Sequence, residues 1–181
     1  TLFLKNDDYK FDKKINIKND FTDWNKLSDF YTPHTDIIIV DNFILSDNTL
    51  IDTNLKAVLE NSLKDGCRKN LNIIIFIKGD QFKTDLTDLK KIIVPCIKAK
   101  YTDDPNITII MHYREHDRTI LRNMLRVYSG DTFNYFWENG SLKTSGKEIH
   151  FSSIADKENY KLYKNTLSDL QAIVNNAVAG N

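Results

Sequence analysis

One short segment in the second half of the sequence brings together side chains that could handle a phosphate group. His116 stands two residues before Arg118, Asn123 follows five residues later, and Gly130 closes the run seven residues after that. A histidine can attack a phosphodiester and form a covalent phosphohistidine that water then hydrolyses. A neighbouring guanidinium can stabilise the negative charge on the phosphoryl oxygens. A centre of His116, Arg118 and Asn123 could therefore bind or cleave an anionic ester, if the three side chains gather in one pocket.

The pattern of these residues resembles the signature of the phospholipase D superfamily, H-x-K-x4-D-x6-G-S followed closely by an asparagine. This chain reads H-x-R-x4-N-x6-G-D, and Asn134 falls one residue later than the asparagine of the family. The string H-D-R-T-I with a later Y-F pair is most similar to the degenerate phospholipase D-like domain at the C-terminus of certain MIT-domain proteins. The resemblance covers residues 36 to about 175 and implies a phospholipase D-like half-domain, with a mixed, mostly parallel sheet flanked by helices.

The activity that the resemblance implies is that of a metal-independent phosphodiesterase or nuclease, without a cofactor. In active members of the superfamily a second histidine, from another copy of the motif, protonates the leaving oxygen. Because this chain has one copy, the resemblance implies a homodimer in which two motifs meet at a two-fold axis. Through the MIT-domain proteins it also implies a non-catalytic alternative, an interaction scaffold or a membrane-associated role.

Three departures from the signature favour binding over catalysis. Arg118 replaces the lysine, and its planar guanidinium holds a phosphate well without reproducing an ammonium group. Asn123 replaces the aspartate that would orient and balance a histidine. Asp131 replaces the serine, and a carboxylate beside a phosphate is repulsive. We therefore predict a phosphate-recognising module with nucleic acid as its ligand, while cleavage and a purely structural turn before a strand stay open as alternatives.

Arginines and aromatic residues are dense around this segment. Arginines at a spacing of four would share one face of an unbroken strand, and we expect a turn that lets only some of them converge. Together with the aromatic residues between them they predict a groove that follows a nucleic-acid backbone and stacks bases. The alternative is a solvated strand face. The ligand-binding residues predicted beside the centre are Arg114, Arg122, Arg126, Gly130, Asn134 and Asp41.

Asp41 and the remaining histidines support narrower predictions. Asp41 follows the apolar run IIIV, and polar groups at the carboxyl ends of parallel strands often line a ligand crevice. Asp41 could orient a histidine, or it could cap a turn with Asn42, which is the more common role. His150 faces away from its apolar neighbours on a strand, toward either solvent or the site. His112 and His116 have no obvious third ligand, so no metal site is predicted.

The apolar segments predict an α/β domain around these residues. Three β-branched runs, in "TDIIIV", "NLNIIIFI" and "NITIIM", are typical of strands buried on both faces. Helices are expected between them, at about 52 to 64 and from about 84 until Pro95 kinks or ends the second. Four later runs, "RTILRN", "LRVYS", "FNYFWE" and "KEIHFSS", predict antiparallel strands with a hairpin turn at "ENGS". A long helix is expected from the N-cap Asp156, with a narrow apolar stripe that packs on the domain or on a second copy.

The N-terminal residues 1–35 are expected to form a strand and helix addition that packs on the main domain, residues 36–181. A hairpin is predicted over residues 2–17, and a short amphipathic helix over residues 21–31. A chain of 181 residues suits this organisation and needs no metal or disulfide for stability.

Charge and cysteine content limit the classes of function. The formal net charge is zero, so that a polyanion or an anionic membrane would have to be met by a local patch. Cys67 and Cys96 have no C-x-x-C spacing, and we predict two reduced, buried thiols and a cytoplasmic location. The longest apolar run is far shorter than the ~20 residues of a membrane span.

Overall fold

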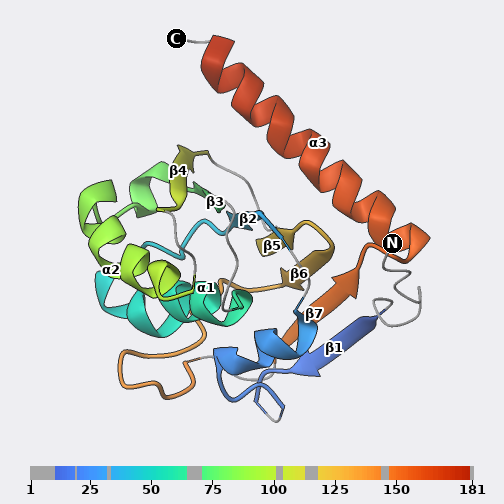
Figure 1. The fold of residues 1–181 in the computed structure, drawn as a ribbon, viewed down its shortest axis with the longest axis horizontal. Coiled ribbons are helices and arrows are strands. Elements are labelled where there is room, and N and C mark those ends of the chain that lie inside the picture. The colour runs from blue at the N-terminus through green and yellow to red at the C-terminus, as the bar shows by residue number, and fades with distance from the viewer. Residues whose placement is uncertain are drawn as a thin grey trace.

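The computed structural model describes residues 11–18, 20–31, 34–64, 71–100, 104–112, 118–143 and 147–179. Within these residues the chain forms a seven-stranded sheet in the order β1-β7-β6-β5-β2-β3-β4 (Figure 1). The strands are β1 (Asp12–Asn16), β2 (Asp36–Val40), β3 (Asn72–Ile77), β4 (Asn106–Met111), β5 (Arg118–Arg122), β6 (Leu125–Ser129) and β7 (Glu148–Ser153).

The pairing of these strands confirms the predicted α/β class and corrects the predicted sheet. Strands β2, β3 and β4 are parallel to one another, whereas β5, β6, β7 and β1 continue the sheet in antiparallel pairs. The expectation of a mostly parallel sheet is therefore wrong. The physical reason is the connection after β5: Arg122 pairs with Leu125, so only Asn123 and Met124 form the turn, and such a short turn allows only an antiparallel return.

The helices largely follow the predicted pattern. Asp85 caps α2 by accepting from the Asp88 N–H at 2.8 Å, and Asp156 caps α3 by accepting from the Glu158 N–H at 2.9 Å. Pro95 does not end α2, because it lies on the exposed side of the last turn, where the missing N–H is easily tolerated. The helical elements are η2 (Trp24–Phe30), η3 (Asn48–Leu50), a π-helical turn η4 (Asp52–Lys56), α1 (Ala57–Ser62), η5 (Gly79–Gln81), α2 (Leu86–Lys98) and α3 (Lys157–Ala179).

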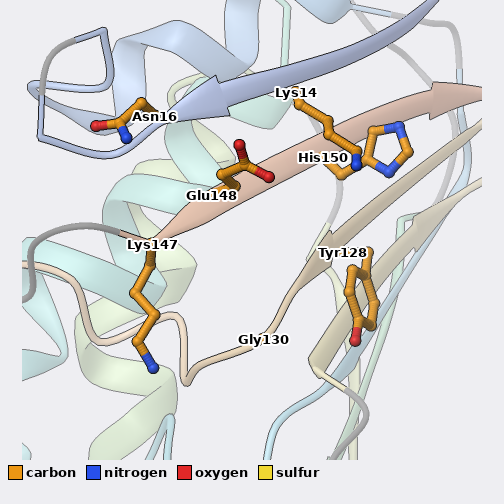
Figure 2. A pocket seen from close by; sticks show the side chains of 7 residues that line it. All are labelled: Lys14, Asn16, Tyr128, Gly130, Lys147, Glu148 and His150. Carbon is orange, nitrogen blue, oxygen red and sulfur yellow. The ribbon is translucent and has the colours of Figure 1, made fainter.

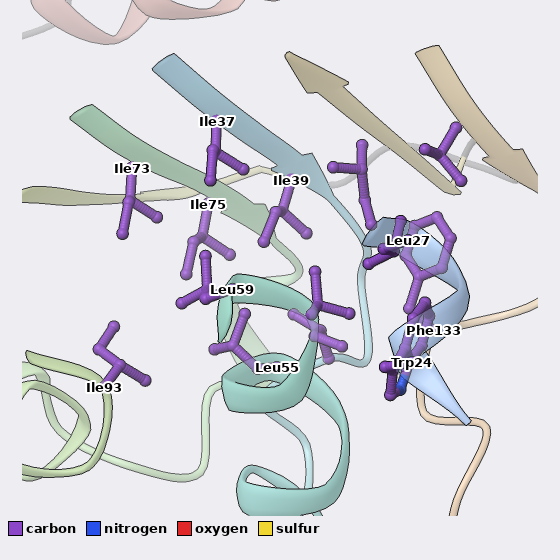
Figure 3. Packing of buried hydrophobic residues seen from close by; sticks show 14 of the residues in the cluster. Trp24, Leu27, Ile37, Ile39, Leu55, Leu59, Ile73, Ile75, Ile93 and Phe133 are labelled. Atoms are coloured by element: carbon purple, nitrogen blue, oxygen red, sulfur yellow. The ribbon is translucent and has the colours of Figure 1, made fainter. Parts of the chain in front are cut away.

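Different elements pack on the two faces of the sheet. On the first face, apolar side chains of β2 and β3 pack against η4, α1, α2 and η2 in one continuous core (Figure 3). Alternate residues of each strand point to this face, as the two-residue period of a strand requires. The residues labelled in Figure 3 are Trp24, Leu27, Ile37, Ile39, Leu55, Leu59, Ile73, Ile75, Ile93 and Phe133.

Helix α3 lies on the second face of the sheet. Its buried Leu170 packs with Val40, Phe76 and Leu121, which come from the central strands β2, β3 and β5. The apolar stripe predicted for this helix therefore packs on the domain. Farther along the same face, β6, β7 and β1 carry polar and partly exposed side chains.

The N-terminal segment contributes to the same sheet and core. Strand β1 pairs antiparallel with β7, and Phe21, Trp24, Leu27 and Phe30 are buried against the first face. The short helix expected over residues 21–31 is the 3-10 helix η2. The strand expected to pair with β1 as a hairpin falls in residues 1–10, outside the described residues.

One predicted strand, "FNYFWE", is a buried loop instead. Asn54 takes the place of a neighbouring strand: its Nδ2 donates to the Phe136 carbonyl at 2.8 Å, and the Phe136 N–H donates to its Oδ1 at 3.0 Å. Phe133 and Tyr135 are fully buried beside it. The predicted turn is present, since an isolated bridge joins Phe136 to Leu142 and a glycine of positive φ, 77°, lies between them.

Candidate functional site at one end of the sheet

The two described residues of the predicted centre, Arg118 and Asn123, do not lie together in one pocket. Arg118 is the first residue of β5, and Asn123 follows its last residue, so five residues of strand, roughly 17 Å, separate them. The Asn123 Oδ1 accepts from the Thr35 N–H at 3.2 Å and from the Asp36 N–H at 3.3 Å. Asn123 therefore holds the start of β2, and its predicted role beside Arg118 is corrected. His116 and Arg114 lie outside the described residues.

Arg122 supports the core and is not placed to touch a ligand. Its side chain is 1% exposed, its Nη2 donates to the Phe30 carbonyl at 2.7 Å, and its Nη1 donates to the Ser62 carbonyl at 3.3 Å. Burial lowers the pKa of this guanidinium to about 10, so the group is still charged at neutral pH. The predicted ligand-binding role of Arg122 is therefore corrected.

Asp41 is a buried support at the end of the sheet that carries Arg118. Its Oδ1 accepts from the Phe43 N–H at 2.9 Å, which forms the expected turn. Its Oδ2 accepts from the Thr132 hydroxyl at 2.8 Å and from the Phe133 N–H at 2.6 Å. Burial raises the pKa of this carboxyl to about 6, although the three hydrogen bonds and the nearby Arg118 charge act in the opposite direction. With no exposed surface, Asp41 positions the loop after β6 and does not touch a ligand.

Asn134 and Gly130 belong to the same loop, in different environments. Asn134 is 3% exposed, and its Nδ2 donates to the Phe43 carbonyl at 2.7 Å, so this side chain is a second tie between the loop and the end of β2. Gly130 faces open space, since a Cβ atom there would meet nothing within 4 Å. Of the two, Gly130 is the one that a ligand can approach.

Arg126 lies on the opposite face of the sheet from Arg118 and Arg122. The turn after β5 separates them, because Arg122 and Leu125 pair on the first face and the next residue points the other way. The Arg126 guanidinium lies over the ring of Tyr128, with 4.9 Å from its Cζ to the ring centroid. The turn expected within the run of arginines is thus present.

A hollow of about 490 Å³ opens on the second face where β6 ends and β7 begins (Figure 2). This volume falls in the range of sites for small ligands. Figure 2 shows side chains from three strands around one space, with the backbone of Gly130 at its border. The residues that line it are Lys14, Asn16, Tyr128, Gly130, Lys147, Glu148 and His150.

The register of the strands builds this hollow. Tyr128 pairs with His150, and His150 pairs with Lys14, so that one residue from each of β6, β7 and β1 stands in a row across the sheet. The His150 Nε2 contacts the Asp12 carboxylate, which fixes the ring. The Lys147 Nζ lies 3.4 Å from the Asp131 carboxylate. The row joins an aromatic ring, an imidazole and an ammonium group, which suits a ligand with a flat ring and a phosphate.

Sequence reasoning did not single out most of these residues. It left the direction of His150 open, and the structure places it in the hollow. A usable signal was present in the alternation of polar residues, Lys14 and Asn16 on one strand and Glu148 and His150 on another. That signal shows which residues share a face, but not that β1 pairs with β7.

Other classes of site receive no support from the described part of the chain. Within it, no three His, Cys, Asp or Glu side chains gather in a way that could hold a metal ion. No helix in those ranges is long and apolar enough to cross a membrane. Cys96 is a free, buried thiol, and burial raises its pKa to about 11, as predicted for a structural cysteine. Cys67 lies outside the described residues.

Comparison with known proteins gives distant similarities. No protein-family model and no curated protein matches the chain. Among solved structures it is similar to TrmBL2, an archaeal chromatin protein described with a novel mode of DNA binding, at 13% identity and a TM-score of 0.39 over 89% of this chain and 52% of that chain. It is also similar to polyphosphate kinase from Porphyromonas gingivalis, at 12% identity and a TM-score of 0.42 over 85% of this chain and 25% of that one.

The chain thus spans about half of the first protein and a quarter of the second. Likenesses at this level do not establish a family, and the phospholipase D resemblance stays a prediction.

Proposed function

We propose that this protein is a phosphate-recognising module that binds nucleic acid in the hollow on the second face of its sheet. The observation that carries the proposal is the row of Tyr128, His150 and Lys14, with Lys147 at the border of the same hollow. Aromatic rings beside cations on a surface are the combination with which proteins hold nucleic-acid strands. The site is therefore shifted from the predicted H-x-R-x4-N unit: of the predicted site residues that the structure describes, only Gly130 lines the hollow.

The end of the predicted motif still contributes to this site. Arg118 pairs with Ser129, and Gly130 follows directly. Asp41 and Asn134 tie down the loop that continues from Gly130, so the motif region supports the border of the hollow. A phospholipase D-like ancestry would account for a motif of this spacing beside the border of the hollow.

Removing both lysines of the hollow is expected to weaken binding of a labelled 15-nucleotide single strand about tenfold, because two phosphate contacts are lost. The double variant Lys14→Ala/Lys147→Ala is compared with the wild type by fluorescence anisotropy. The matched control is Lys90→Ala/Lys91→Ala, which removes two exposed lysines of α2, a helix that packs on the first face of the sheet. Equal affinity of the first variant and the wild type would contradict the proposal, as would a wild type that binds no oligonucleotide.

The same samples separate binding from cleavage. Incubation of the labelled strand without added metal, followed by electrophoresis, is expected to leave it intact. Cleavage that disappears in His116→Ala would instead support the phosphodiesterase alternative.

A further inference from the structure

We propose that the hollow takes one unstacked nucleotide of a single strand, with the base against the ring of Tyr128 and the phosphate beside Lys14 and Lys147. This inference rests on the proposed function and names the part of the nucleic acid that the site recognises. It selects single-stranded over double-stranded nucleic acid, and it assigns the selection to one aromatic residue.

The arrangement of the row fits the two ends of a nucleotide. Tyr128, His150 and Lys14 are successive register partners, so the row crosses three strands and spans roughly 10 Å. An aromatic ring stands at one end and an ammonium group at the other. His150, held by Asp12, fills the middle of the row with a second flat ring. A base on Tyr128 would therefore have its phosphate directed toward the lysine side.

The ring of Tyr128 is held in place before any ligand arrives. The Arg126 guanidinium lies over it at 4.9 Å, while Tyr128 also lines the hollow. A ring that is fixed on one side loses little side-chain entropy when a base stacks on the other. Bases have a π-face whatever their identity, so this contact is tolerant of sequence.

The charges of the hollow argue against a bare polyanion as its ligand. The cations that line the hollow, Lys14 and Lys147, have carboxylates nearby: Asp131 pairs with Lys147, Glu148 lines the hollow itself, and Asp12 contacts His150. A chain of phosphates would meet Glu148 and gain little. A nucleotide places one phosphate near the lysines and an uncharged base in the part of the hollow beside Tyr128. A duplex hides its bases in the stack and cannot present one to Tyr128.

The test measures affinity for a labelled 15-nucleotide strand, as DNA and as RNA, and for the duplex of the same DNA sequence. The wild type is expected to bind both single strands at least tenfold more tightly than the duplex, with a slope of log affinity against log salt of about −0.7, because one phosphate is held. Tyr128→Ala is expected to reduce affinity for the single strands about tenfold. Tyr128→Phe keeps the ring and should stay within about twofold of the wild type.

Inorganic polyphosphate serves as a competitor without bases. At equal phosphate concentration it is expected to compete more weakly than unlabelled single strand, and Tyr128→Ala is expected to leave its binding unchanged. If Tyr128→Ala does not fold, Tyr128→Thr, which keeps a strand-forming residue without a ring, replaces it.

The outcomes distinguish this inference from the function on which it rests. Equal binding of single strand and duplex, or a ringless variant that binds like the wild type, overturns the inference. If Lys14→Ala/Lys147→Ala still weakens binding in that case, the proposed function stands. Absence of all oligonucleotide binding overturns both. A preference for DNA over RNA, or the reverse, leaves the stacking inference intact and shows which of the two nucleic acids the hollow prefers.

Discussion

Replacing Arg122 by alanine is expected to lower the free energy of unfolding by about 3 to 4 kcal/mol. The guanidinium donates to the Phe30 carbonyl and to the Ser62 carbonyl. These carbonyls belong to the last residues of η2 and α1, where helix carbonyls have no partner within the helix and carry partial negative charge. Alanine would leave both carbonyls buried without a donor, and it would also open a cavity in the core.

The experiment is urea unfolding of the wild type, Arg122→Ala and Arg122→Met. Methionine restores much of the volume but no donor, so the free energy of unfolding of Arg122→Met should lie between those of Arg122→Ala and the wild type. Arg126→Met is the matched control, because Arg126 is partly exposed on the other face of the sheet. Its effect on stability is expected to stay below about 1 kcal/mol. A loss in Arg122→Ala no larger than that of Arg126→Met would show that the two carbonyls do not depend on this arginine.

The central strands could be predicted from the sequence because each carries its own signal. Strands β2 and β3 are continuous β-branched runs that the structure covers on both faces, as predicted, whereas the similar run of β4 lies at the edge of the sheet, where most of its residues are at least partly exposed. Asp156 ahead of an apolar stripe was enough to place the start of α3. Such signals are local, and the structure retains them.

The candidate site could not be predicted in the same way, because its residues are brought together by pairing between distant strands. Lys14 meets His150 through the pairing of β1 with β7, and no local pattern specifies that pairing. The spacing of the motif also misled, since counting along the chain does not show that the turn expected within the arginine run falls directly after Arg122. The length of β5 separates Asn123 from Arg118, and the turn places Arg126 on the other face.

The loop "FNYFWE" shows why alternation alone is not sufficient. Its apolar residues alternate as in a strand, and Phe133, Tyr135 and Phe136 are indeed buried. No strand of the sheet pairs with them in the described residues. Instead, Asn54 satisfies the backbone of Phe136 and Asp41 satisfies that of Phe133. A single buried side chain can thus replace a strand partner, and its position is fixed only by tertiary structure.

Asp41 is expected to make the stability of the protein depend on pH. Folding raises the pKa of this carboxyl from 3.8 to about 6, chiefly through burial. Between these two values the folded state binds the proton more tightly than the unfolded state does. The free energy of unfolding therefore falls as the pH rises through this window, and the contribution is lost above the folded pKa. Between about pH 4.5 and about pH 7.5 the decrease should amount to roughly 2 kcal/mol.

Other carboxylates act in the opposite direction, so the contribution of Asp41 must be isolated as a difference. Salt bridges lower the pKa of exposed Asp80 and Asp88, which favours the folded state at higher pH. The free energy of unfolding is therefore measured across the pH range for the wild type, for Asp41→Asn and for Asp104→Asn, an exposed control.

Asparagine at position 41 can still accept from the Phe43 N–H, but it places an amide nitrogen against the Phe133 N–H, so Asp41→Asn should be less stable than the wild type at low pH. The difference in the free energy of unfolding between the two proteins should shrink by roughly 2 kcal/mol as the pH rises, because only the wild type then keeps a charged group buried at this position. If the free energies of unfolding of the wild type and Asp41→Asn change with pH in parallel, the Asp41 carboxyl has the same pKa in the folded and the unfolded chain. The loop that follows Gly130 would then be held by a solvated charge, and the border of the hollow would be less rigid than the geometry indicates.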